Sequence, residues 1–123
     1  GVFVNVDDDV KAAIDRLKPR EALYVGGMGA REKNFHNDLM CRRGFADAAA
    51  RVQELYLAGH KKEAEEAVPD EWIDLKSLMG PPARIKERYK AWDECGATSL
   101  TVRSAQEEAM HVMADAARLN QPR

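Results

Sequence analysis

The chain opens with a short alternation of apolar residues and then changes to helical spacing. Valine occupies every second position of the first six residues, GVFVNV, which predicts a strand over 1–6 that is buried on at least one face. The aspartates at 7–9 supply an N-cap and favourable charge at the start of a helix. Pro19 is expected to end this helix and to open the next, because a first helical position does not need the N–H that proline lacks.

Helical spacing recurs through most of the remaining sequence. Apolar residues three or four positions apart, with glycine or proline as breaks, predict about six helices. The later segments are expected at 30–43, 45–58, 60–68, 69–78, 82–95 and 104–119, and the tail at 120–123 is expected to fray. Ser104 and Glu107 have the spacing of a capping box for the last helix. Residues 20–29 fit either a strand that leads into a glycine loop or a helix whose glycines allow close packing.

A second strand is predicted over 97–102, where β-branched residues are frequent. Each of the two predicted strands is followed directly by a helix, which is typical of parallel α/β units rather than of a hairpin. Two strands alone make a marginal sheet. The sequence therefore predicts an α/β fold with an incomplete parallel sheet, such as a segment of a (β/α) barrel or of a doubly wound sheet.

Large apolar side chains are few for a chain of this length. Ile, Leu, Val and Phe together number 24 of 123 residues, while alanine alone numbers 19. That is just under the level of ~20% below which chains struggle to form a core, but a small net charge and patterned apolar positions argue against disorder. A helix-rich chain with a thin core fits the composition. Because no methionine precedes Gly1, we expect a piece of a larger protein.

Charge and hydropathy exclude several classes of function. The 19 basic and 21 acidic residues are interspersed, so no basic surface for nucleic acid is expected. No apolar run approaches the ~18 residues of a membrane span. Cys41 and Cys95 have no CxxC partner, and we interpret both as reduced thiols of a cytoplasmic protein.

The candidate chemistry in the sequence is sparse. Gly26, Gly27 and Gly29 lack the spacing of a dinucleotide or P-loop motif, so they fit either a weak phosphate-binding loop or close helix packing. The histidines at 36, 60 and 111 have no partners that complete a metal site, and no base is placed near Cys41. We therefore assign no catalytic residue and no metal ligand.

One positional clue concerns the ends of the two predicted strands. Ligand sites of parallel barrels lie where strands end and the following loops begin. Those points are Asn5 with Asp7, and Thr101 with Arg103. The polar side chains at 5, 99 and 101 either face a barrel mouth or merely satisfy nearby backbone groups.

Three stretches of the sequence resemble a known family. They are EALYVGGMGAREKNFHNDLMCRRGF, the helix that ends in LYLAG, and LMGPPARIKERYKAWDECGATSLTV. Together they are similar to the C-terminal third of luciferase-like monooxygenases, and most of all to the branch that depends on the deazaflavin coenzyme F420. The likeness extends from about Val2 to Ala117.

The resemblance implies that residues 1–123 are the C-terminal part of one (β/α)8 TIM barrel whose N-terminal part is absent. Residues 1–6 would be its seventh strand and 97–102 its eighth, giving two parallel strands and about six helices. It implies an oxidoreductase that moves a hydride between coenzyme F420 and a small organic substrate when full length, and possible homo-oligomers. This segment alone is expected to be inactive. Arg31 and Asn34, which follow the glycine cluster, are the residues expected near the cofactor or substrate.

Two alternatives to this function stay open. The first keeps the barrel but replaces coenzyme F420 with flavin mononucleotide (FMN) and oxygen chemistry. The second is a non-catalytic helical interaction module that carries two short strands.

Overall fold

The computed structural model describes residues 1–119, and the expected fraying at 120–123 lies outside the described residues. The chain forms two units. Unit 1 consists of Gly1–Ala13 together with Lys76–Arg123, and unit 2 is the continuous segment Ile14–Leu75. Unit 2 is therefore inserted in the sequence between the two segments of unit 1.

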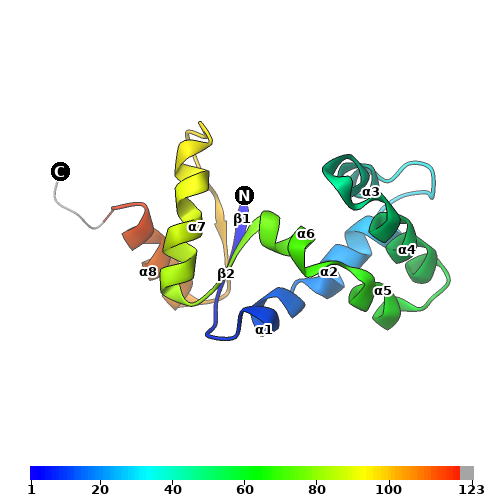
Figure 1. Ribbon diagram of the computed structural model, residues 1–123, viewed down its shortest axis with the longest axis horizontal. Helices are drawn as coiled ribbons and strands as arrows, with labels where there is room; N and C mark the ends of the chain where they lie inside the picture. Colours follow the sequence, from blue (N-terminus) through cyan, green and yellow to red (C-terminus); the bar gives the residue numbers. More distant parts are fainter. Residues whose placement is uncertain (120–123) are drawn as a thin grey trace. The chain divides into compact units, whose positions relative to one another are not determined.

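Unit 1 is built on a sheet of three parallel strands in the order β2-β1-β3 (Figure 1). The strands are β1 (Val2–Val6), β2 (Ser77–Gly80) and β3 (Val102–Arg103). Val4 pairs with Leu78 of β2, and Val2 pairs with Val102 of β3. The α/β class and the first strand are thus confirmed, and the described strands form an open sheet.

Two strand predictions were wrong. The helix expected over 69–78 is α6 (Asp70–Leu75); it ends at Leu75, and a third strand, which was not predicted, follows at 77–80. All four residues of β2 are buried, so its sequence lacks the alternation that reveals a half-exposed strand. The last strand is also much shorter than 97–102, because residues 97–99 are exposed and ladder pairing begins only at Val102.

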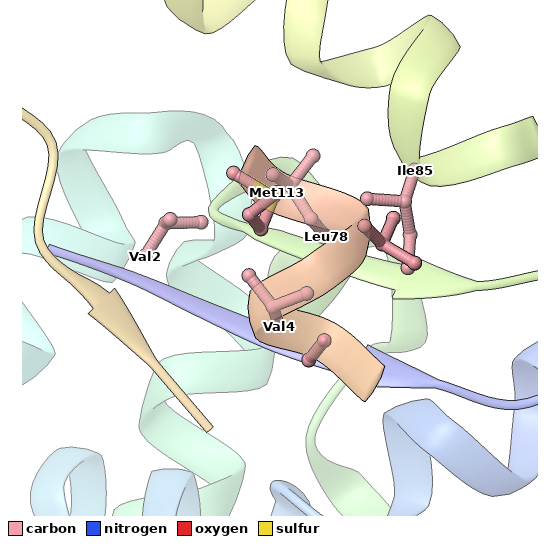
Figure 2. Close-up of a cluster of buried hydrophobic side chains, with 7 residues drawn as sticks. Val2, Val4, Leu78, Ile85 and Met113 are labelled. Atoms are coloured by element: carbon pink, nitrogen blue, oxygen red, sulfur yellow. The ribbon is translucent and has the colours of Figure 1, made fainter. Parts of the chain in front are cut away.

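The apolar core of unit 1 lies between the sheet and the two helices α7 (Pro82–Glu94) and α8 (Glu107–Ala116). Figure 2 shows the side chains of Val2 and Val4 from the central strand turned toward Ile85 and Met113. The complete buried cluster is Val2, Val4, Leu78, Ile85, Ala109, Val112 and Met113. Seven such side chains form a small core, in keeping with the few large apolar residues of the sequence.

The start of α8 differs from the prediction. Gln106 is the N-cap residue, and no side chain caps the helix, so the expected capping box of Ser104 and Glu107 does not form. The Ser104 hydroxyl instead accepts a hydrogen bond of 3.1 Å from the Gln106 backbone N–H. Ser104 closes a local turn, as serine often does when its hydroxyl competes for a nearby N–H.

Unit 2 is helical. Residues 1–119 contain eight α-helices and two π-helical turns, into which the roughly six predicted helical segments are divided. Those not yet named are α1 (Val10–Asp15), α2 (Lys18–Ala22), η1 (Leu23–Gly27), α3 (Phe35–Met40), η2 (Cys41–Phe45), α4 (Ala46–Leu57) and α5 (Lys61–Ala67). Two predictions are confirmed: Asp9 caps α1 through Ala12 N–H at 3.1 Å, and Pro19 lies in the first turn of α2. The first helix itself ends at Asp15, before the end expected at Pro19. The helix expected over 30–43 begins only at Phe35.

The ambiguous segment 20–29 is helical as far as Gly27. A Cβ atom at Gly26 would lie 2.5 Å from Cβ of Tyr56, and one at Gly27 would lie 2.5 Å from Cε1 of the same ring. Both distances are shorter than real Cβ contacts. At Gly26 the neighbouring atoms move only with the backbone of α4, so this position needs glycine, whereas at Gly27 the neighbour is the outer part of the Tyr56 ring. Close packing, rather than a strand that runs into a loop, explains these two glycines.

Candidate functional site

The carboxyl ends of the three strands meet at one edge of the sheet, because all three strands are parallel. The Asp7 backbone N–H donates a 3.1 Å hydrogen bond to the Gly80 carbonyl, which joins the end of β1 to the end of β2. The Gln106 side chain joins the end of β1 to the start of α8: Oε1 accepts from Val6 N–H at 2.7 Å, and Nε2 donates to the Val6 carbonyl at 3.0 Å. Ligands of parallel α/β sheets bind at such an edge.

The face of the sheet opposite α7 and α8 carries both apolar and polar side chains. Val2 and Val4 belong to the core under the helices, so strand alternation turns Phe3 and Asn5 to the opposite face. The ladder places Ser77 beside Phe3 and Met79 beside Asn5. From the other neighbouring strand, the Arg103 guanidinium carbon lies 5.6 Å from the centre of the Phe3 ring.

This arrangement corrects part of the positional clue. Asn5 and Asp7 do lie at the carboxyl end of β1. Ser99 and Thr101, by contrast, precede β3 and are exposed, and the Thr101 carbonyl accepts a 2.8 Å hydrogen bond from Val2 N–H. They therefore lie toward the amino ends of the strands, and Arg103 is the polar residue that β3 brings to its carboxyl end.

The predicted site residues Arg31 and Asn34 lie in unit 2, in the loop between η1 and α3. This loop, 28–34, is a tight turn: Lys33 N–H donates to the Ala30 carbonyl at 2.9 Å. Gly29 has a φ of +126°, and a Cβ atom there would lie 2.5 Å from the Lys33 carbonyl oxygen. Only glycine fits this position, so the turn has a defined shape that exposes the Arg31 side chain.

Asn34 is 1% exposed, and its side chain forms hydrogen bonds with other residues of unit 2. Its Nδ2 donates to the carbonyls of Tyr24 and Val25, both at 2.9 Å. Its Oδ1 accepts from Asn37 N–H at 3.0 Å, which makes Asn34 the N-cap of α3. The amide therefore ties the loop to η1 and fixes the first turn of the following helix.

Two more amides stabilise the same loop, and neither was singled out from the sequence. Gln53 of α4 is buried, and its Nε2 donates to the Arg31 carbonyl at 3.2 Å. Asn37 Nδ2 donates to the carbonyls of Val25 at 3.1 Å and Ala49 at 2.9 Å. Gln53 is buried and Asn37 is half-buried, and the sequence marks them only as amide side chains within helical segments.

The remaining residues considered from the sequence include a histidine and the two cysteines. His36 lies edge-on to Tyr24, with ring centroids 4.7 Å apart, and edge-on to Phe35 at 5.6 Å. Cys41 and Cys95 are free thiols. Among the described residues, no three His, Cys, Asp or Glu side chains are grouped so that they could hold a metal ion. No helix within residues 1–119 is both long and apolar enough to cross a membrane.

Comparison with known proteins places the chain in a family. The family model described as luciferase-like monooxygenase matches residues 1–99. A Mycobacterium tuberculosis protein named "Putative coenzyme F420-dependent oxidoreductase" is 36% identical over 111 residues. That match covers 90% of this chain and 32% of the relative, so the chain spans about a third of the relative's length. No solved structure matches. The chain therefore belongs to the luciferase-like monooxygenase family.

Proposed function

We propose that this chain is part of a coenzyme F420-dependent oxidoreductase that transfers a hydride to or from a small organic substrate. The observation that carries the proposal is the 36% identity, over 90% of the chain, to a protein whose name states coenzyme F420 dependence. A match of this extent includes the inserted helical unit and most of unit 1.

The fold that we propose for the complete protein is a (β/α)8 barrel, of which β1 and β3 are the seventh and eighth strands. Their parallel pairing, Val2 with Val102 and Phe3 with Arg103, supports this numbering. Strands of such a barrel are neighbours in chain order, so β1 should have an earlier strand on its other side. In the segment described here β2 occupies that side. We therefore expect that in the complete barrel an earlier strand, and not β2, pairs with this side of β1.

In the proposed enzyme the coenzyme supplies the hydride chemistry, and the protein binds, orients and excludes water. At the carboxyl edge this face of the sheet ends in Asn5, whose amide is chemically suited to the carbonyl and anionic oxygens of a deazaflavin coenzyme. The Arg103 guanidinium lies toward the amino end of β1, where its Nε is 3.2 Å from the position that a Cβ atom at Gly1 would take. The described residues form only one side of such a site, so the upstream part of the protein would have to provide the rest.

Arg31 and Asn34 have different roles in this proposal. Arg31 has an exposed guanidinium on a turn of defined shape, which suits contact with an anionic group of coenzyme or substrate. Asn34 is buried and saturated with internal hydrogen bonds, so it would act by holding the loop that presents Arg31. The small-molecule partners and a homo-oligomeric state are part of the same proposal.

A calorimetric titration of the complete protein with coenzyme F420 and, in parallel, with FMN tests the assignment. Saturable binding of coenzyme F420 without binding of FMN is the expected result. Binding of FMN alone would support the flavin alternative, and the visible spectrum of the purified protein would then show a flavin. Binding of neither would favour the non-catalytic interaction module.

A further inference from the structure

We infer that Gln106 is a positioning residue, which fixes the carboxyl end of β1 and thereby the side chains on either side of Val6. The inference rests on the proposed function, because it assumes that the carboxyl edge of the sheet is part of the reaction site. Gln106 itself contacts the backbone of Val6 and acts through it.

The Gln106 amide takes the place of a missing strand partner. On this side of β1 the ladder with β3 consists of Val2 with Val102 and Phe3 with Arg103. Val6 lies beyond it, where the chain of β3 has already turned toward α8. The side-chain amide offers one donor and one acceptor, like a peptide group, and it satisfies both Val6 N–H at 2.7 Å and Val6 C=O at 3.0 Å.

Gln106 is itself held at its backbone. It is the N-cap residue of α8, and its N–H donates to the Ser104 hydroxyl at 3.1 Å. Two hydrogen bonds thus link the end of β1 to the start of α8, across 100 residues of sequence, and a third fixes the Gln106 backbone locally to Ser104. The core packing of Ala109 and Val112 holds the rest of this helix against the sheet.

The position of Val6 determines where two polar residues point. Asn5 precedes it and faces the side of the sheet away from the helices, and Asp7 follows it with its N–H bonded to Gly80. Rotation of the Val6 peptide groups would turn both neighbours. A misplacement of about 1 Å at a reacting site can lower the rate by roughly a hundredfold. Gln106 therefore controls geometry at the proposed site without touching a ligand.

Substitutions of Gln106 separate this role from simple stabilisation. Gln106→Glu keeps the size and the acceptor but turns a carboxylate oxygen toward the Val6 carbonyl, and Gln106→Ala removes both bonds. Val112→Ala is the matched control, since Val112 belongs to the same helix and to the core rather than to the edge. All variants are made in the complete protein.

Two measurements are made on each variant: amide hydrogen exchange at Val6, and binding and turnover of coenzyme F420 at a temperature where every variant is folded. We expect both Gln106 variants to exchange faster at the Val6 amide and to lose about tenfold or more in coenzyme affinity or kcat. Val112→Ala should lower the melting temperature without either effect.

Unchanged exchange at Val6 would overturn the inference, and so would faster exchange with unaltered affinity and kcat. A wild-type protein that binds no coenzyme F420 would instead contradict the proposed function. In that case the exchange rate of the Val6 amide alone decides whether Gln106 fixes the end of β1. Failure of the Gln106 inference and failure of the proposed function are therefore distinguishable.

Discussion

The Trp72 indole Nε1 donates a 2.9 Å hydrogen bond to Oε2 of Glu21, 51 residues earlier in the chain. Both side chains are buried, with exposures of 4% and 5%. The bond joins α6 to α2, the last and one of the first helices of unit 2, and the Phe45 ring packs against the same indole at 5.7 Å. A buried carboxylate and a buried indole thus hold the two ends of the inserted helical unit together.

Trp72→Phe removes the indole donor while it keeps most of the apolar volume. Because it withdraws a donor from the buried Glu21 carboxylate, we expect a loss of about 1–3 kcal/mol in the free energy of unfolding. Urea denaturation of the complete protein, followed by circular dichroism, measures this loss. Trp92→Phe, at a half-buried position of unit 1, is the control and should cost less. Equal losses in the two variants would contradict the assigned role.

Gly26→Ala and Gly27→Ala test the close packing of η1 against α4. The added Cβ at Gly26 would lie 2.5 Å from Tyr56 Cβ and 3.2 Å from the Val52 carbonyl oxygen, atoms that move only with the backbone of α4. At Gly27 the neighbour is the outer part of the Tyr56 ring, which can rotate away. Overpacking costs about 1–3 kcal/mol, and we expect Gly26→Ala to be the more destabilising of the two.

Thermal unfolding of both alanine variants gives the comparison directly. If Gly26→Ala melted at the wild-type temperature, the packing explanation of the glycine cluster would be wrong, and a ligand-binding role for these glycines would regain support.

Asn34→Asp separates the two functions of the Asn34 amide. Aspartate is as good an N-cap as asparagine at an exposed helix start. Here it would keep the acceptor for Asn37 N–H but would replace the donor to the carbonyls of Tyr24 and Val25 by an oxygen. We therefore expect Asn34→Asp to destabilise the protein at least as much as Asn34→Ala does, as measured by denaturant unfolding.

The exposed cap of α1 is the control for this experiment. Asp9 caps through a single 3.1 Å bond to Ala12 N–H, and Asp9→Asn should change stability little. An Asn34→Asp variant as stable as the wild type would mean that the two carbonyl contacts contribute nothing.

The sequence predicted those elements whose pattern is local. Alternation predicts the valines of β1, and helical spacing predicts that Ile85 lies on the apolar face of α7. The place of Pro19 in the first turn of α2 follows from its missing N–H. The strand at 77–80 could not be found in this way, because four consecutive buried residues next to a helix continue its apolar spacing. What makes them a strand is the pairing with β1, more than 70 residues away in the sequence.

The candidate site shows the same limit. The sequence singled out Asn34, but its partners Tyr24 and Val25 are backbone carbonyls, which no side-chain pattern marks. Gln106 was missed because the spacing of Ser104 and Glu107 fits a capping box, whereas the structure uses Gln106 to complete the edge of a strand. Contacts between a side chain and a distant backbone group depend on the tertiary fold, and so they appear only once the fold is known.

The measurement that tests the central claim most directly is a fluorescence titration of coenzyme F420 with the complete protein and, separately, with residues 1–123. If the chain supplies one part of a barrel whose site needs the remainder, the complete protein will change the coenzyme's fluorescence saturably and residues 1–123 will not. Tight, stoichiometric binding by residues 1–123 alone, or no binding by the complete protein, would contradict the account.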